Sequence, residues 1–318
     1  QGLSRAGLWH FIPGSKAVGD EIFGGEMYGI VQENVVCHKI KLPPNKRGRI
    51  TFICARGDYS LTDEILQIEN TSGQQEQFTL VQRWPIRKPR PVQSFLRCQT
   101  ALTTGLRVLD SLFPVPLGST CAVPKGPGRN TVLHSLFKYS NTHVIVYVAC
   151  GEMTVGVTEI LRDLPCVEFE RGHPEAVGPV TQRMCIIANG LDKSMGAIEA
   201  SLHTGATIAE YFRDMGHDVL LVTDSVCRWG RAVAGLAAHQ GVAHTVTSKI
   251  ARGLDSLYER AGVVHCEGGD AQGSLTIIPI VTDARETDEA TEHTLQSVSA
   301  YWALDVEMLK RKHFPEVN

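Results

Sequence analysis

The chain has 318 residues, 43% of them hydrophobic and 20% charged, which is enough for one large or two smaller globular domains with hydrophobic cores. Its formal net charge of −3 and the lack of a dense Lys/Arg block disfavour nucleic acid as a partner. Its nine cysteines include no C-x₂-C pair, which argues against a disulfide framework or a zinc site and predicts an intracellular protein with reduced thiols.

Residues 1–91 predict a small antiparallel β-rich unit. Short runs rich in β-branched and aromatic residues alternate with turn residues over 26–34, 38–60, 63–70 and 78–85. The segment WPIRKPRPVQSF, residues 84–95, carries three prolines and few apolar residues. We therefore expect this segment to be a linker that runs over the protein surface.

Residues 92–318 show a different pattern, in which apolar strands alternate with helical stretches. The strand-like runs, rich in Val and Ile, are residues 119–123, 143–150, 183–189, 217–225 and 274–281. Most are separated by enough chain for a helical crossover, which is typical of a mostly parallel, buried sheet. The clearest helix is predicted over 196–216, where apolar residues recur at roughly helical spacing from Ile198 to Phe212 and Gly216 ends the pattern. The predicted fold class is therefore α/β.

The segment VPKGPGRNT, residues 123–131, occupies the place of a phosphate-binding loop, after an apolar run and before a predicted helix. A loop of the form G-x-x-x-x-G-K-[ST] holds phosphates with backbone N–H groups and a lysine, and it holds Mg²⁺ with a hydroxyl. When the two are aligned on the threonine, this chain has a proline, Arg129 and Asn130 where the pattern has Gly, Gly and Lys. The loop therefore lacks the lysine that would neutralise phosphate charge.

Two interpretations of this loop are open. Gly126 and Gly128 still allow backbone N–H groups to approach an anion at the start of a helix, and Thr131 still offers a hydroxyl to Mg²⁺. The alternative is a simple Gly-Pro-Gly turn followed by a helix-start threonine. On these residues alone the simple turn is the favoured interpretation.

Two carboxylates follow apolar runs at the predicted carboxyl ends of parallel strands, where such sheets bind ligands. Glu152, in YVACGEM, could orient or deprotonate a water that attacks a terminal phosphate. Asp224, in VLLVTDS, has the position of a Walker-B aspartate that holds Mg²⁺. Taken singly, Glu152 is more often a solvated or capping residue, and a helix N-cap is an equally good interpretation of Asp224. The chain order of phosphate loop, glutamate and aspartate favours a nucleotide site.

Longer stretches of the sequence closely resemble the catalytic A subunit family of eukaryotic V-type proton ATPases. The matching phrases span most of the chain and include GEMYGIVQEN, FTLVQRWPIRKPRPV, TTGLRVLDSLFP, EASLHTGATIAEYFRDMGHDV and LYERAG. The resemblance implies a RecA-like P-loop domain over residues 92–318, in a hexameric ring of A and B subunits where ATP hydrolysis turns a rotor and drives proton transport. It implies that residues 1–91 resemble part of the A-subunit-specific insert region. We also expect that the N-terminal β-barrel and the C-terminal helical domain of the family are absent.

The resemblance assigns roles to five residues. Thr131 matches the P-loop threonine that coordinates Mg²⁺, and Asp224 matches the Walker-B aspartate of the same metal site. Glu152 matches the glutamate of the family's Gly-Glu-Arg loop, and Arg260, in YERAG, falls on a motif arginine, so both are predicted catalytic residues. Phe314, in KHFP, resembles the aromatic residue that packs near adenine. The predicted nucleotide-binding residues are Gly126, Gly128, Arg129, Asn130, Thr131 and Phe314.

The departures from the family pattern gather where the chemistry would occur. Asn130 stands in place of the P-loop lysine, and Arg129 lies one position early, with a planar guanidinium that does not freely replace an ammonium. Met153 replaces the arginine that follows the family's glutamate, and residues 230–249 and 281–291 also differ from the family sequence. Because the loss of one preorganised charge typically lowers a rate by about 10²–10³-fold, we expect ATP hydrolysis to be absent or very weak.

The leading prediction is a divergent A-subunit-like protein that works with a B-type partner and with other components of the soluble head. Mg²⁺ and ATP or ADP are its expected ligands if binding is retained. No apolar run approaches the ~20 residues of a membrane span, so we predict a cytoplasmic protein that reaches vacuolar or endosomal membranes only through the complex. One alternative is an active subunit in which Arg129 or Lys125 replaces the lost lysine. Others are a non-enzymatic interaction module that competes for the same partners, and a decaying duplicate with no role.

Overall fold

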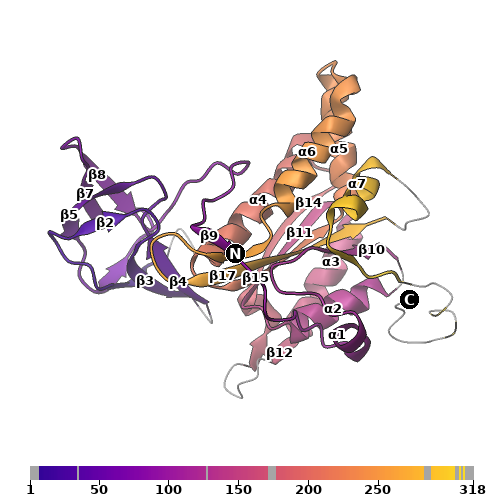
Figure 1. The fold of residues 1–318 in the computed structure, drawn as a ribbon, viewed down its shortest axis with the longest axis horizontal. Coiled ribbons are helices and arrows are strands. Elements are labelled where there is room, and N and C mark those ends of the chain that lie inside the picture. The colour runs from indigo at the N-terminus through magenta and orange to yellow at the C-terminus, as the bar shows by residue number, and fades with distance from the viewer. Residues whose placement is uncertain are drawn as a thin grey trace.

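The computed structural model describes residues 7–33, 36–126, 128–170, 177–282 and 288–304, together with 308 and 311. A β-rich unit formed by the N-terminal strands lies beside a larger α/β unit (Figure 1). The two units touch through polar contacts as well as packing. Lys41 donates a hydrogen bond of 3.2 Å to the backbone oxygen of Glu267, and the ring of His217 lies 3.3 Å from the backbone oxygen of Cys37.

The described part of the β-rich unit contains two four-stranded antiparallel sheets, with the orders β4–β3–β1–β6 and β2–β5–β7–β8. The strands are β1 (Trp9–Pro13), β2 (Glu21–Phe23), β3 (Met27–Glu33), β4 (Val36–Lys41), β5 (Arg47–Ile53), β6 (Gly57–Tyr59), β7 (Glu64–Glu69) and β8 (Gln75–Thr79). Buried and half-buried residues alternate along β4, because successive side chains of a strand point to opposite faces. The buried faces share one core that includes Phe11, Ile50 and Leu66. The predicted antiparallel β-rich unit is confirmed.

An eight-stranded, mostly parallel sheet forms the centre of the α/β unit among the described residues. Six of its strands follow the order β14–β11–β15–β17–β10–β18, while β16 pairs antiparallel with β17 and β9 pairs antiparallel with β16. These strands are β9 (Ser94–Leu96), β10 (Cys121–Pro124), β11 (Val144–Glu152), β14 (Met184–Gly190), β15 (Asp218–Asp224), β16 (Gly262–His265), β17 (Gln272–Val281) and β18 (Ala300–Tyr301). A separate two-stranded antiparallel sheet is formed by β12 (Glu168–Glu170) and β13 (Val177–Pro179). The α/β class and the mostly parallel sheet are confirmed.

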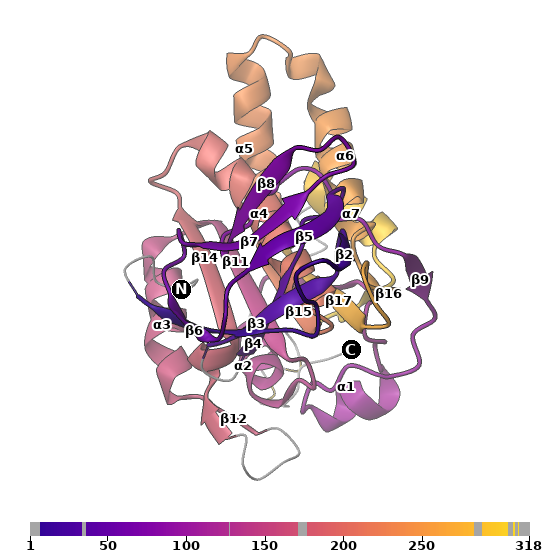
Figure 2. The same ribbon diagram turned by 90° about the vertical axis from the view of Figure 1, so that its left-hand side faces the viewer.

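Helices cover both faces of this sheet, as Figures 1 and 2 show. They are α1 (Arg107–Leu112), α2 (Arg129–Tyr139), α3 (Thr154–Asp163), α4 (Met195–Asp214), α5 (Val226–His239), α6 (Val246–Tyr258) and α7 (Glu289–Ser297), with short 3₁₀ turns at Leu164–Cys166, Val180–Arg183 and Ala243–Thr245. The helix predicted over 196–216 is confirmed as α4, whose N-cap Ser194 accepts a hydrogen bond from the backbone of Ala197. Gly216, at φ +85°, follows the end of the helix.

Strand β11, which lies between β14 and β15, packs on different helices through its two faces. All nine of its residues are buried. Tyr147 belongs to the same core as Leu133 of α2, whereas Val148 belongs to the core that contains Leu202 of α4. This division follows from the two-residue period of a strand and explains why the run VIVYVAC is apolar on both faces, apart from the hydroxyl of Tyr147.

A pair of glycines in α4 tests this packing. A Cβ atom added at Gly205 would overlap Cγ2 of the buried Val148, whereas one added at Gly196 would meet no atom within 4 Å. We expect Gly205→Ala to lower the free energy of unfolding by about 1–3 kcal/mol through overpacking. The matched control Gly196→Ala should leave it unchanged or raise it by up to about 1 kcal/mol, because alanine favours a helix over glycine. Urea unfolding followed by circular dichroism measures both, and equal effects would contradict this account.

Candidate nucleotide-type site

The predicted site residues Glu152 and Asp224 lie at one edge of the sheet, where parallel strands end. Asp224, the last residue of β15, pairs in register with Ala149 of β11, and β11 ends three residues later at Glu152. On the other side, Asp224 is level with Ile280 of β17. The loop after β10 begins at the same level, because Pro124 pairs with the next residue of β17, Val281. The sheet thus brings the loop and both carboxylates together, as their strand-end positions predict.

Glu152 is held by two cations. Its side chain is 6% exposed, and Nζ of Lys125 and Nη1 of Arg228 each lie 2.8 Å from one of its carboxylate oxygens. The backbone N–H of Met153 adds a hydrogen bond of 3.1 Å. Burial alone would raise the pKa of Glu152, but the hydrogen bond from Lys125 and the charges of Lys125 and Arg228 outweigh it, so this pKa lies below its ordinary value. Glu152 is therefore ionised and already paired.

Asp224 is fully buried and is also paired. Nη1 of Arg129 donates to both carboxylate oxygens, at 2.9 and 3.2 Å, and the hydroxyl of Tyr147 donates to one of them at 2.9 Å. Burial is the largest influence on the Asp224 carboxyl and raises its pKa, and the charge of Arg129 opposes this shift. The guanidinium of Arg129 therefore serves as the counter-charge that this buried carboxylate requires.

The loop delivers Arg129 to this position by its backbone shape. Gly128 is the N-cap of α2 and has φ +86°, a left-handed conformation that favours glycine. Arg129 begins the helix, and its Nε and Nη2 atoms donate to the side-chain oxygen of Asn130 at 3.1 and 2.9 Å. Asn130 thereby helps to fix the orientation of the Arg129 guanidinium towards Asp224. Gly126, Asn130 and Thr131 are exposed.

These residues, as they lie, do not fit a magnesium nucleotide. Mg²⁺ needs open oxygen ligands, but both oxygens of Asp224 accept hydrogen bonds from Arg129. Among the described residues, no group of three or more His, Cys, Asp and Glu side chains could hold a metal ion. The cations that could receive a phosphate, Lys125 and Arg129, are each bonded to a carboxylate of the site. A metal ion would first have to displace Arg129 from Asp224.

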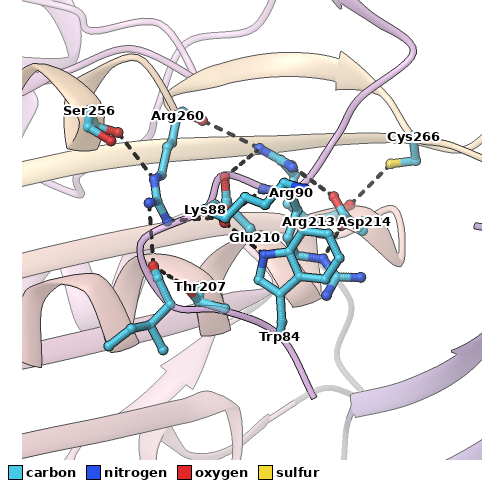
Figure 3. A network of polar contacts seen from close by, with 11 residues as sticks. Trp84, Lys88, Arg90, Thr207, Glu210, Arg213, Asp214, Ser256, Arg260 and Cys266 are labelled. Atoms are coloured by element: carbon cyan, nitrogen blue, oxygen red, sulfur yellow. Dashed lines mark hydrogen bonds and ion pairs between the residues drawn. The ribbon is translucent and has the colours of Figure 1, made fainter. Parts of the chain in front are cut away.

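Arg260 does not join this site within the chain. Its buried guanidinium contacts Glu210 at 3.3 Å and donates to the backbone oxygens of Ser256 and Ile86 (Figure 3). Glu210 lies close to the end of α4, which precedes β15, whereas Asp224 is the last residue of β15. Arg260 thus lies towards the opposite end of this strand from Asp224. A catalytic role for Arg260 stays a prediction from the resemblance, and Phe314 lies outside the described residues.

The same network holds the linker. Nε of Arg90 lies 2.6 Å from a carboxylate oxygen of Asp214, and its backbone N–H donates to Glu210 at 3.2 Å (Figure 3). The Arg90 guanidinium also stacks 5.0 Å from the ring centre of Trp84. Because the Arg90 side chain is only 5% exposed, the expectation that residues 84–95 simply run over the surface is wrong at this residue. Arg90 thus holds the linker against α4 through its contacts with Glu210 and Asp214.

Three contributors to the site were not predicted from the sequence. Tyr147 is a polar residue inside an apolar run, and the need of a buried hydroxyl for a partner was a usable signal. Arg228 lies within the first turn of α5, four residues after Asp224, but nothing in its spacing points to Glu152. The sequence predicts Lys125 only as a possible substitute for the lost lysine, whereas in the structure Lys125 pairs with Glu152.

The ion pair between Lys125 and Glu152 can be tested by titration. We expect Lys125→Met to raise the pKa of Glu152 by about one unit or more, since one unit corresponds to ~1.4 kcal/mol and the variant loses a charge-assisted hydrogen bond. Carboxyl-carbon NMR of the two proteins measures this shift. Because the folded-state pKa of Glu152 is depressed, its stabilising contribution is present above the unfolded value of about 4.3 and is lost as the pH falls through the folded value. Lys193→Met, which removes a cation from the exposed Asp192 pair, should leave Glu152 unchanged.

The sheet order, the helices on both faces and the strand–loop–helix unit at β10 and α2 define a RecA-like P-loop fold. The chain belongs to the ATP synthase alpha/beta family, whose nucleotide-binding domain profile matches residues 105–318. The profile of the ATP synthase alpha/beta subunit barrel-sandwich domain matches residues 1–87.

Several curated relatives are named as the catalytic A subunit of the V-type proton ATPase. The chain is 42% identical to that of Zea mays, with 99% of this chain and 58% of the relative aligned, and 41% identical to that of Cyanidium caldarium, with 99% and 55% aligned. It thus spans little more than half the length of these relatives. A solved ATPase of the type III secretion system of pathogenic bacteria shares the fold, with a TM-score of 0.60, 22% identity, and 97% of this chain and 75% of that chain covered.

Proposed function

We propose that this chain is an A-subunit-like protein of a V-type rotary ATPase head whose own ATP hydrolysis is absent or very weak. The observation that carries the proposal is the buried ion pair of Arg129 with Asp224, in a loop where Asn130 stands in place of the lysine. This pair neutralises the carboxylate that would hold Mg²⁺, and it engages the guanidinium that could have replaced the lysine. The alternative of an active subunit is therefore disfavoured.

The family and the named relatives support the rest of the proposal. They favour a partner of the B-subunit type within a soluble head, and a cytoplasmic protein that is peripheral to vacuolar or endosomal membranes. None of the described helices is both long and apolar enough to cross a lipid bilayer. We divide the chain into a β-rich unit over 1–91 and a nucleotide-binding-type domain over 92–318. Binding of Mg²⁺ with ATP or ADP, if it occurs, is expected to be weak.

The test is a calorimetric titration with Mg·ATP and Mg·ADP, followed by a phosphate-release assay on the same sample. We expect phosphate release no greater than that of the Glu152→Gln variant, because loss of the P-loop cation and of an open metal ligand each lowers the rate by about 10²–10³-fold. A family member with an intact P-loop serves as the positive control. Phosphate release that disappears in Glu152→Gln would overturn the proposal.

The interaction with partners is tested separately. Co-purification with a B-type subunit, to the same extent with and without nucleotide, would support a protein that assembles without hydrolysing ATP. This outcome would also fit an interaction module that competes with the catalytically active form. Failure to bind any component of the soluble head would contradict the proposed place in the complex and leave the prediction about hydrolysis intact.

A further inference from the structure

A groove of about 440 Å³ lies between the linker, α4, α5 and α6. Figure 2 shows the α5–α6 helical hairpin that forms one side of it, projecting beyond the central sheet. The groove shares no residue with the site around Glu152 and Asp224. Its volume falls within the range of about 300–1,000 Å³ that is typical of small-molecule sites.

The floor of the groove is apolar. It includes the buried residues Trp229, Val233 and Ala237, of which Trp229 and Val233 belong to one core, and the half-buried Leu236. The indole N–H of Trp229 donates to the backbone oxygen of Glu199 at 3.0 Å, so this polar atom is satisfied without a ligand. A Cβ atom on Gly253 would overlap the indole ring, so the glycine allows α6 to lie against it. The apolar surface that an alkyl or aryl group could reach is therefore mainly that of Leu236 and Val233, with the buried Trp229 and Ala237 behind them.

The rim of the groove is positively charged. Arg87 lies at one side and is paired with Glu199, which His203 also contacts at 3.2 Å. Lys249 and Arg252 lie on α6, where Lys249 donates to the side-chain oxygen of Gln240 and Arg252 donates to the backbone oxygen of Ser248. Neither forms an ion pair with any residue that the structure describes. The carboxylate of Glu199 is thus balanced, while two cations of the rim have no acidic counterpart among the described residues.

We propose that this groove binds a small amphipathic anion, an alkyl or aryl group that carries a carboxylate, sulfonate or phosphate. The apolar part lies against Leu236 and Val233, and the anionic head meets Lys249 and Arg252. Charge complementarity selects an anion over a cation of the same shape. The proposal does not depend on the loss of ATP hydrolysis, because the two sites are formed by different residues.

Calorimetric titration with decanoate, at low ionic strength, tests the proposal on the complete chain. We expect a dissociation constant on the order of 10–100 μM and at least about tenfold weaker binding of decyltrimethylammonium, which has the same chain and the opposite charge. The double variant Lys249→Gln/Arg252→Gln should bind decanoate at least about tenfold more weakly, as expected for lost charge-assisted contacts. The control pair Arg162→Gln/Arg231→Gln removes two cations that do not line the groove and should bind as the parent does.

A second variant tests the apolar half. Leu236→Gln places an amide in the wall of the groove and should weaken decanoate binding while the far-ultraviolet spectrum and thermal midpoint stay close to those of the parent. The proposal is overturned if decanoate produces no heat of binding up to about 1 mM, a concentration that marks very weak affinity. It is also overturned if the Lys249/Arg252 variant binds decanoate as tightly as the parent. Binding of an acidic peptide in the same titration, without binding of decanoate, would likewise overturn it.

Discussion

Replacement of Glu210 by alanine is expected to lower the free energy of unfolding by about 3–5 kcal/mol, because it removes one member of a buried ionic network. Glu210 is 1% exposed and accepts a hydrogen bond from the Arg90 backbone. Its carboxylate lies 3.3 Å from Arg260 and 3.7 Å from Arg213. Without it, Arg90 and Arg213 would share Asp214, and Arg260 would have no carboxylate partner among the described residues.

Urea unfolding followed by circular dichroism measures this effect. The control is Glu76→Ala, which removes the ion pair between Glu76 and Lys46. The side chains of this pair are 26% exposed for Glu76 and 45% exposed for Lys46. An exposed pair contributes only about 0–1 kcal/mol, so this control should stay within that range. Glu210→Gln keeps the shape and part of the hydrogen bonding, and we expect an intermediate loss. A loss for Glu210→Ala no larger than that for Glu76→Ala would show that the network does not hold the linker to α4.

The strands of the central sheet could be predicted because their composition follows from burial on both faces. The run VIVYVAC became the fully buried β11, and the other Val- and Ile-rich runs became β10, β14, β15 and β17. The short strands β9 and β16 carry no such pattern, and they form by pairing with each other and with β17. Pairing between distant short segments depends on the completed fold, so periodicity alone cannot reveal it.

The position of the linker shows the same limit for charged residues. Its prolines and basic residues favour a solvated segment, yet Arg90 is buried because Asp214, 124 positions along the chain, provides its counter-charge. A charged side chain is buried only where a partner is present, and a single sequence does not identify partners at that separation. The polarity of residues 84–95 therefore predicted the wrong environment for this arginine.

The candidate site could be predicted in outline but not in its pairing. Chain order placed the loop, Glu152 and Asp224 at one sheet edge, which the register of β11, β15 and β17 bears out. The resemblance indicates that Asn130 stands at the position of the P-loop lysine, but it gives no reason to expect an ion pair between Arg129 and Asp224. That pairing follows from the left-handed backbone at Gly128, which aims the first residue of α2 towards the end of β15.

The double variant Arg129→Gly/Asn130→Lys, which restores the glycine and the lysine that precede the P-loop threonine, is expected to raise the affinity for Mg·ATP by about 10²-fold or more. The first change frees the Asp224 carboxylate for a metal ion, and the second supplies an ammonium for a phosphate. Each gains a charge-assisted contact of about 1.5–3 kcal/mol, and 1.4 kcal/mol corresponds to tenfold. Calorimetric titration of the parent and the double variant measures the gain.

The single variants separate the two steps of this argument. Asn130→Lys alone should bind Mg·ATP little better than the parent, because Arg129 still holds Asp224. Among the described residues, Arg129→Gly alone leaves the buried Asp224 with the Tyr147 hydroxyl as its one hydrogen-bond donor, so this variant should lose about 3–5 kcal/mol of stability. Millimolar MgCl₂ should restore part of that stability in Arg129→Gly and none in the parent, since only the variant has an open carboxylate. If the parent binds Mg·ATP as tightly as the double variant, Arg129 does not block the metal position and the ion pair is not the reason for impaired catalysis.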